Sequence, residues 1–188
     1  KRFLGIEQDF EVNNAASKVE PTLVGIYPIK SGSTALSQIY LPSDLITNGF
    51  SLTSDGWIVT YSANINTNNF DNLVVIYDGN VFPIDQVIAD EVTGVVFIKI
   101  SASNLPVAIL GDSDELNLGQ LTLTLNDLEE AVVHNVKANS FMEVSSGSDY
   151  VLSSEEYGES IVLEGELAEN YLGSPVVNLG GEVVGIVS

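Results

Sequence analysis

Apolar residues alternate with polar or small ones in many short runs along this chain, as they do in strands that bury one face. The runs recur at intervals of about 8–12 residues, separated by Gly, Asn, Asp and Pro, which is typical of a sandwich or barrel and not of βαβ units. The sequence therefore predicts a mostly β fold. The expected strands are residues 22–29, 35–41, 49–54, 57–63, 73–78, 81–90, 94–100, 120–125, 131–138, 140–145, 160–167, 175–179 and 182–188.

Dipeptides that favour tight turns separate several of these runs. Asp55-Gly56 and Asp78-Gly79 are Asp-Gly turns, and Gly180-Gly181 stands between two apolar runs. Both central residues of the commonest hairpin turn have positive φ, which glycine adopts without strain. We therefore expect a hairpin in which both of these glycines have positive φ.

One helix is expected, close to the N-terminus. In the segment 6–19, apolar residues follow one another mostly at three- or four-residue spacing, and Pro21 then prevents the helix from continuing. The segment 145–160 is rich in Ser, Gly and acidic residues, and it predicts a surface loop or an exposed hairpin.

The composition indicates one globular unit with a real core, because 45% of the 188 residues are hydrophobic. Six basic against 26 acidic residues give a net charge of −20, which repels phosphate backbones and anionic lipid. We expect no nucleic-acid partner and no membrane insertion, since no apolar stretch approaches the ~18 residues that a membrane helix needs. The chain has no cysteine and therefore no disulfide or thiolate chemistry. No metal or other cofactor is expected, because Asp112 and Asp114 lack the rest of a calcium loop.

Five longer segments follow one another along the chain. They are "AASKVEPTLVGIYP" from Ala15, "SDGWIVTYSANI" from Ser54, "DEVTGVVFIKI" from Asp90, "NLPVAILGDSDELNLGQ" from Asn104 and "LAENYLGSPVVNLGGEVVGI" from Leu167. In this order and at this spacing they resemble the trypsin-like serine protease domain of the HtrA (Deg) type. The resemblance implies an all-β double barrel of the trypsin-like (chymotrypsin) fold with a short N-terminal helical arm.

The resemblance also locates the catalytic triad of that family, and each position holds a different side chain here. The family's histidine falls on Ala63, its aspartate on Gly94 and its nucleophilic serine on Leu172. Acyl transfer of this kind needs a base within hydrogen-bond distance of a hydroxyl, and these side chains supply neither. The resemblance therefore implies a pseudoprotease, which is not an enzyme and has no catalytic residues.

The family's oxyanion-binding loop falls on Asn170, Tyr171 and Leu172. In the family, backbone N–H groups of this loop stabilise the developing oxyanion, and glycine allows the tight turn. Asn170 stands in place of that glycine and tolerates left-handed backbone, so the turn could be retained, whereas the Leu172 side chain would fill the place of a substrate carbonyl. Ser174 replaces a second glycine, and we expect it to be a small residue packed before Pro175.

The chain has one histidine, His134, in an expected strand of the second barrel. The family's base comes from the first barrel, and no motif marks a serine and an orienting acid beside His134. We therefore expect a strand histidine that is exposed or hydrogen-bonded. Trp57 aligns with an apolar or aromatic strand position, and we expect it in the core.

These expectations combine into a single protease-homology domain. Residues 1–20 form the arm, 21–106 the first barrel and 107–188 the second barrel, which would lack the final strand and helix of the family.

The favoured function is a catalytically inactive domain that binds peptide or protein segments or has a regulatory role. The alternative is an oligomerisation or scaffolding domain, such as a trimer in which Phe3 and Phe10 of the arm pack on a neighbouring copy. An active serine endopeptidase is the less favoured alternative. The family also implies an extracytoplasmic location, periplasmic or at the cell surface, with any membrane anchor outside these residues.

Overall fold

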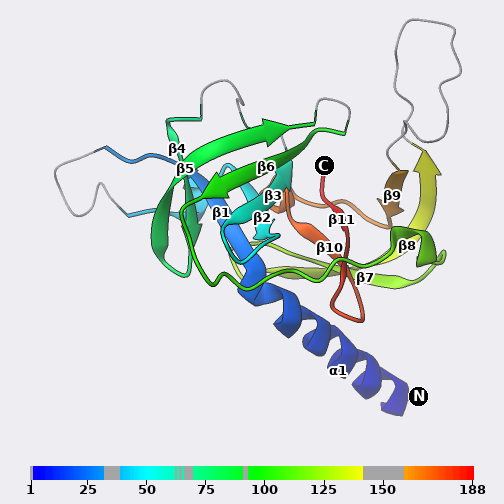
Figure 1. The fold of residues 1–188 in the computed structure, drawn as a ribbon. Helices are drawn as coiled ribbons and strands as arrows, with labels where there is room; N and C mark the ends of the chain where they lie inside the picture. The colour runs from blue at the N-terminus through cyan, green and yellow to red at the C-terminus, as the bar shows by residue number, and fades with distance from the viewer. Residues whose placement is uncertain are drawn as a thin grey trace, which may run out of the picture.

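Two β-sheets and an N-terminal helix make up the described part of the chain (Figure 1). The computed structural model describes residues 2–31, 39–61, 63, 65, 70–90, 93–141 and 159–188. The mostly β fold is confirmed. The elements are α1 (Arg2–Val19), β1 (Leu23–Pro28), β2 (Thr47–Ser51), β3 (Trp57–Tyr61), β4 (Leu73–Tyr77), β5 (Asn80–Ala89), β6 (Val95–Ile100), β7 (Leu121–Leu125), β8 (Ala131–Phe141), β9 (Glu159–Leu163), β10 (Pro175–Asn178) and β11 (Val183–Ile186), with short 3-10 helices at Glu20–Thr22, Pro42–Asp44, Ser113–Glu115 and Glu169–Tyr171.

The first sheet closes into a six-stranded antiparallel barrel with the order β1-β2-β3-β6-β5-β4. Alternate residues of its strands point inward, so that Val24, Ile26, Ile58, Val75 and Ile98 are fully buried in one core. The alternation in the sequence therefore corresponds to the inner and outer faces of this barrel.

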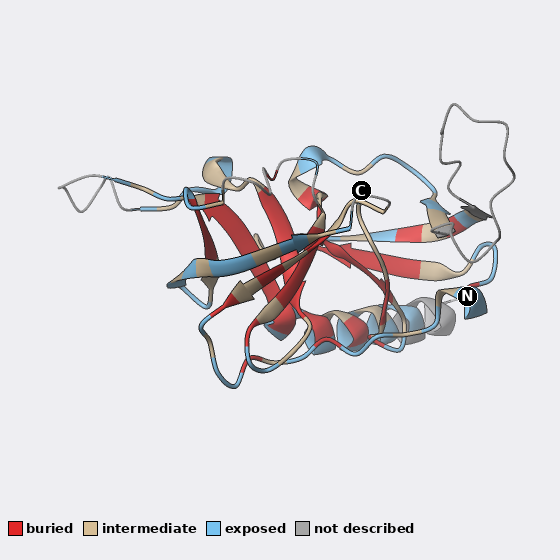
Figure 2. Cartoon of the chain, turned by 45° about the horizontal axis from the view of Figure 1, so that its top comes forward, coloured by how far each residue is buried: buried red, intermediate tan, exposed pale blue. Residues whose placement is uncertain are grey.

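The second sheet is a five-stranded half-barrel with the order β11-β10-β7-β8-β9. One face carries a small apolar core that includes Val136, Val176 and Val184. The opposite face buries Leu123 and Val177 in a core shared with the first barrel and the helix. The second sheet is thus buried on both faces over its middle strands (Figure 2).

Helix α1 packs against this opposite face. Ala15 and Val19 are almost completely buried there, whereas residues 8–11 are exposed (Figure 2). Lys18 Nζ donates a hydrogen bond of 2.8 Å to the carbonyl oxygen of Gly180, which ties the helix to the β10–β11 turn. The helix ends before Pro21, as expected, but it begins at Arg2, four residues earlier than the apolar spacing indicated. No helix in the described ranges is long and apolar enough to cross a membrane.

Most expected strands are present, with two differences. Residues 39–41, the described end of the expected strand 35–41, are not in a strand. The expected strands 131–138 and 140–145 are one strand, β8, as far as Phe141, because β9 continues to pair with it. The loop expected at 145–160 lies almost entirely outside the described residues.

The predicted turns at Asp78-Gly79 and Gly180-Gly181 differ in how many of their residues have positive φ. Asp78 and Gly79 both have positive φ, at 46° and 71°, and they join β4 to β5 as predicted. At Gly180-Gly181 the predicted hairpin is present, since β10 pairs with β11, but only Gly181 has positive φ (83°). The Gly181 N–H donates to the carbonyl oxygen of Asn178 at 3.0 Å, so the turn begins two residues before Gly180.

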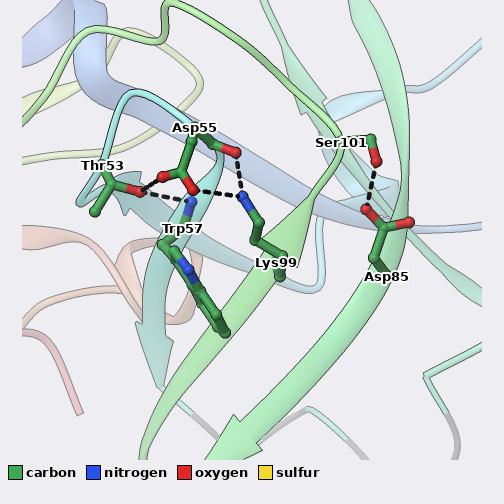
Figure 3. Close-up of polar contacts among 6 residues, drawn as sticks. All are labelled: Thr53, Asp55, Trp57, Asp85, Lys99 and Ser101. Carbon is green, nitrogen blue, oxygen red and sulfur yellow. Dashed lines mark hydrogen bonds and ion pairs between the residues drawn. The ribbon is translucent and has the colours of Figure 1, made fainter.

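The turn before β3 is held by polar contacts (Figure 3). Asp55 accepts hydrogen bonds from Thr53 Oγ1 and from Lys99 Nζ, the latter at 3.1 Å. The hydrogen bond from Thr53 lowers the pKa of the Asp55 carboxyl most. The hydrogen bond from Lys99 and the charge of Lys99 lower this pKa further. The expectation that Trp57 lies in the core was wrong: it is half-buried, and Lys99 Nζ lies 5.9 Å from its ring centroid, which is a cation–π contact.

Candidate functional site

The segments that contain Ala63, Gly94 and Leu172, where the family's triad is expected, all lie near the end of β3. Ala63 is exposed in the turn after β3. A Cβ atom built on Gly94 would lie 2.7 Å from a ring carbon of Tyr61, and one built on Gly173 would lie 2.7 Å from Thr60 Oγ1. The turn before β6 and the loop that contains Leu172 therefore both contact the last residues of β3. The surroundings of Gly94 and of Leu172 therefore meet at the last residues of β3.

Tyr61 covers the Gly94 position. Gly94 has a φ of 75°, which L-residues other than glycine rarely adopt, and the Tyr61 ring occupies the space that a side chain would need. A carboxylate at this position would require both a change of backbone and movement of the ring. The Tyr61 ring is half-buried and contributes to a cavity of about 240 Å³ together with Val95, Ile186 and Ser188.

The loop before β10 is folded as a 3-10 turn, Glu169–Tyr171, followed by Leu172. The Leu172 N–H donates to the carbonyl oxygen of Glu169 at 3.1 Å, so this N–H is used within the loop. Asn170 does not use the left-handed backbone that asparagine tolerates, because it lies in the 3-10 turn and has no positive φ. The reason is local, since the i→i+3 hydrogen bonds of the turn require right-handed backbone. Leu172 itself is half-buried.

Asn48 in β2 holds this loop from the first barrel. The carbonyl oxygen of Leu172 accepts hydrogen bonds from the Asn48 N–H at 2.8 Å, from Asn48 Nδ2 at 3.1 Å and from Thr47 Oγ1 at 3.0 Å. Asn48 Nδ2 also donates to the carbonyl oxygen of Asn170 at 2.7 Å. The loop is thus fixed by donors from another sheet and not only by its own turn.

The same Asn48 side chain binds a second loop. Its Oδ1 accepts a hydrogen bond of 2.9 Å from the N–H of Asp127, in the turn between β7 and β8. Asn48 is completely buried, and its side-chain amide is hydrogen-bonded at both ends. One strand residue of the first barrel therefore connects two loops of the second sheet.

Asp127 packs against β1 of the first barrel. Tyr27 Oη donates a hydrogen bond of 3.1 Å to Asp127 Oδ2, and a Cβ on Gly25 would lie only 2.3 Å from the same oxygen. Burial raises the pKa of the Asp127 carboxyl to about 6, and the hydrogen bond from Tyr27 offsets part of this rise. Burial, followed by the effect of Asp127, raises the pKa of the Tyr27 phenol well above its ordinary value.

His134 and Ser174 lie apart from each other. His134 is 5% exposed, and its Nδ1 lies 3.1 Å from the carbonyl oxygen of Glu164, which fits the expected hydrogen-bonded strand histidine. His134 pairs with Thr122, which in turn pairs with Asn178. Asn178 lies four residues beyond Ser174, so His134 and Ser174 are offset by about 13 Å along the strands. Ser174 is fully buried, as expected, and its Oγ has no partner within the described residues.

The acidic segment after Gly111 forms a turn, as expected. Asp112 Oδ1 accepts a hydrogen bond of 2.9 Å from the N–H of Asp114 and so caps the short helix Ser113–Glu115. Within the described ranges no group of three or more His, Cys, Asp or Glu residues could hold a metal ion.

The N-terminal arm carries one exposed aromatic side chain of the expected pair. Phe10 on α1 is 72% exposed. Phe3 lies in the same helix, but its side chain lies outside the described part. Near Phe10, the residues Gln8, Val12 and Val133 contribute to a shallow cavity of about 420 Å³.

Comparisons with known proteins define the class of this fold and site. The family model of the trypsin-like peptidase domain matches residues 47–186. A solved HtrA-type structure, "HtrA-type protease AlgW with decapeptide", superposes with a TM-score of 0.70 over 93% of this chain and 57% of that chain, at 19% sequence identity. The double-barrel trypsin-like fold is therefore confirmed, and the chain belongs to the trypsin-like peptidase domain family, as an HtrA-type member.

Two named relatives illustrate the likeness in sequence. The "Probable periplasmic serine endoprotease DegP-like" of Halomonas elongata is 31% identical over 141 residues, which cover 75% of this chain and 28% of that protein. "Serine protease HTRA1" of Xenopus laevis is 30% identical over 143 residues, which cover 74% of this chain and 30% of that protein. The chain thus matches less than a third of the length of either relative.

The residues that hold these loops in place have no signal in the sequence. Asn48, Thr47 and Tyr61 are ordinary strand residues in the sequence, and Asp127 is one of 26 acidic residues. Their roles depend on contacts across the two sheets, for which spacing along the chain carries no signal.

Replacing Asn48 by Ala is expected to destabilise the protein by about 3 kcal/mol, because it leaves the Asp127 N–H and the Asn170 carbonyl without partners. Urea denaturation measures this loss, and limited proteolysis should show faster cleavage within 126–130 and 168–174. The exposed Asn72→Ala is the matched control and should change stability by less than about 0.5 kcal/mol. Equal stability of the two variants would contradict the role of Asn48.

Replacing Asp127 by Asn is expected to stabilise the protein at pH 8 and to have little effect at pH 4. The folded pKa of about 6 lies above the ordinary value of 3.8, so the stability that the neutral carboxyl contributes is lost as the pH rises through about 6. Allowing for partial solvent screening, the gain at pH 8 should be about 1–2 kcal/mol, measured by urea denaturation at both pH values. Asp71→Asn, on an exposed turn, should show no such pH dependence, and a gain that is the same at pH 4 and pH 8 would refute this assignment.

Proposed function

We propose that this domain is a catalytically inactive HtrA-like protease homologue that binds peptide or protein segments. The observation that carries the proposal is the state of the loop before β10. Leu172 lies where the family's nucleophile is expected, and its N–H donates to Glu169 instead of pointing toward a substrate. Neither an alkyl side chain nor an occupied N–H can promote attack on a peptide bond.

The other two expected triad positions support the same proposal. Ala63 carries only a methyl group, and the Tyr61 ring fills the space beside Gly94. The single histidine is buried in β8, with Nδ1 beside a backbone carbonyl oxygen. A general base near Leu172 would therefore have to come from a residue type that rarely serves this reaction.

The favoured activity is binding, since the fold of the family remains while the reactive groups are missing. The relatives are named serine endoproteases, and the AlgW structure is titled with a decapeptide. A domain that keeps such a fold without its reagents can still take an extended segment by adding it to a sheet edge. The relatives named periplasmic also support an extracytoplasmic location for this domain.

A second candidate function is oligomerisation through the N-terminal arm. Phe10 is 72% exposed on a helix whose first turns extend beyond the second sheet (Figure 1), and Val133 on β8 is exposed nearby. A large aromatic side chain in this position is typical of a contact with another polypeptide. Copies of the domain, as in a trimer, would pack there.

The proposed lack of catalysis is tested with a fluorophosphonate probe and with unfolded casein. We expect no covalent labelling and no casein fragments, whereas trypsin in the same experiment should give both. Binding is measured separately, as a rise in the fluorescence anisotropy of labelled, reduced and alkylated lysozyme, a basic unfolded protein that suits a chain of net charge −20. Labelling that disappears in the Ser174→Ala variant would identify an active serine and overturn the proposal.

Oligomerisation through the arm predicts that Phe10→Ser reduces the sedimentation coefficient to that of a monomer. The control is Ile88→Ser, which removes another exposed apolar side chain, on β5, and should leave the assembly unchanged. Sedimentation velocity at several concentrations distinguishes these results. A wild-type protein that is already monomeric would rule out the arm as an interface.

A further inference from the structure

Strand β2 contains the one Asn-Gly pair of the chain, Asn48-Gly49. Asparagine is chemically labile, most of all before glycine, which has no Cβ to hinder its own backbone nitrogen. That nitrogen attacks the side-chain carbon Cγ of the asparagine and forms a five-membered succinimide, while the side-chain nitrogen leaves as ammonia. Water then opens the ring to give aspartate or isoaspartate. The most reactive asparagine of the sequence is therefore the residue that holds two loops of the second sheet.

Gly49 follows Asn48 for a reason of packing. A Cβ at this position would lie 2.7 Å from the carbonyl oxygen of Val59 and 3.0 Å from Cγ2 of Ile58, both on β3. The first of these contacts is closer than a carbon and an oxygen approach in folded proteins, and the oxygen belongs to the backbone of a paired strand, which has little room to move. The pairing of β2 with β3 thus needs the glycine that makes Asn48 labile.

The strand protects this pair from ring closure while the barrel is intact. Gly49 pairs with Val24 of β1 on one side and with Thr60 of β3 on the other, which holds the backbone extended. Ring closure needs a rotation about ψ of Asn48 that brings the Gly49 nitrogen toward Cγ. A strand that is paired on both sides cannot make this rotation without breaking its ladder of hydrogen bonds.

The side-chain amide of Asn48 is held as well. Nδ2 donates to the carbonyl oxygens of Asn170 at 2.7 Å and Leu172 at 3.1 Å, and Oδ1 accepts from the Asp127 N–H at 2.9 Å. The residue is completely buried, so bulk water does not reach it. Ring closure and hydrolysis therefore both need β2 to separate from its neighbours, in a local or a global opening.

Deamidation would remove the contacts that protect the site. An ionised aspartate at position 48 has an oxygen in place of Nδ2, so the carbonyl oxygens of Asn170 and Leu172 would face a carboxylate instead of a donor. A buried charge without a partner is strongly unfavourable. Isoaspartate would in addition lengthen the backbone of β2 by one carbon and disturb its register with β1 and β3. Neither product restores the contacts of Asn48 at neutral pH.

We propose that Asn48-Gly49 is a modification site at which opening of β2 leads to deamidation, so that a domain that has stayed open refolds without its hold on the loops at 126–130 and 168–174. The change is one-way, because ammonia is lost and the native contacts of Asn48 cannot form again. The site needs only the fold and water, and it acts in the same way whether or not the domain binds a segment.

The rate of deamidation is compared for the native protein and for protein unfolded in guanidinium chloride, at pH 8 and the same temperature. Mass spectrometry of the proteolytic peptide that contains Asn48 measures the product, and a synthetic peptide of residues 46–51 in both solutions corrects for the denaturant. We expect deamidation at least about tenfold faster in the unfolded protein, because opening of β2 limits the reaction in the native one. Isomerisation at Asp55-Gly56 leaves the mass unchanged, so a gain in mass identifies asparagine.

Refolding measures the consequence of the modification. Wild-type protein is kept unfolded for increasing times, returned to native buffer and subjected to limited proteolysis. The fraction that resists cleavage at 126–130 and 168–174 should fall in proportion to deamidation at Asn48. Asn48→Ser, which lacks the labile amide, is the matched control, and its refolded fraction should not depend on the time spent unfolded.

The aspartate product is also made directly. Asn48→Asp should lower the midpoint of denaturation in guanidinium chloride and speed cleavage of both loops. Asn72→Asp adds the same charge on an exposed turn and should leave both measurements unchanged.

Each result bears on one step. Equal rates in the native and the unfolded protein would overturn the protection by β2, and full recovery of deamidated protein would overturn the loss of the loop contacts. A time-dependent loss in Asn48→Ser as large as in the wild type would assign the loss to a different lesion and overturn the role of Asn48. None of these results depends on whether alkylated lysozyme binds, so failure of the proposed binding function is seen separately.

Discussion

The hydrogen bonds of Asn48 are the interaction on which the arrangement of the two sheets depends. Asn48 is completely buried in β2, and its amide binds Asp127 at one end and the carbonyl oxygens of Asn170 and Leu172 at the other. A buried amide that lost these partners would cost more than the bonds contribute, because its donors and acceptor would have no water to replace them. The geometry of all three segments is therefore coupled through one side chain.

This coupling determines what the loop before β10 can do. The Leu172 carbonyl oxygen receives three donors from β2, so the loop is held in one position relative to the first barrel. Its N–H is used within the 3-10 turn. The same contacts that hold this loop in place leave it without a free donor at Leu172, which supports the proposed binding function.

The two sheets differ in closure although they share a strand order. The first barrel has hydrogen-bonded strands all round and an apolar core, whereas the second sheet has five strands among the described residues.

The sequence by itself determined the class of fold, because inner and outer faces of strands alternate along the chain and turns such as Asp78-Gly79 need particular backbone angles. It also determined the order of the five segments that resemble the family, and with them the positions Ala63, Gly94 and Leu172. Local pattern was insufficient at Gly180, where a hydrogen bond within the turn sets the backbone. Only the tertiary structure decided that Asn48 holds the loops, because that role depends on partners 79 or more residues away and a buried Asn in a strand has no sequence pattern of its own.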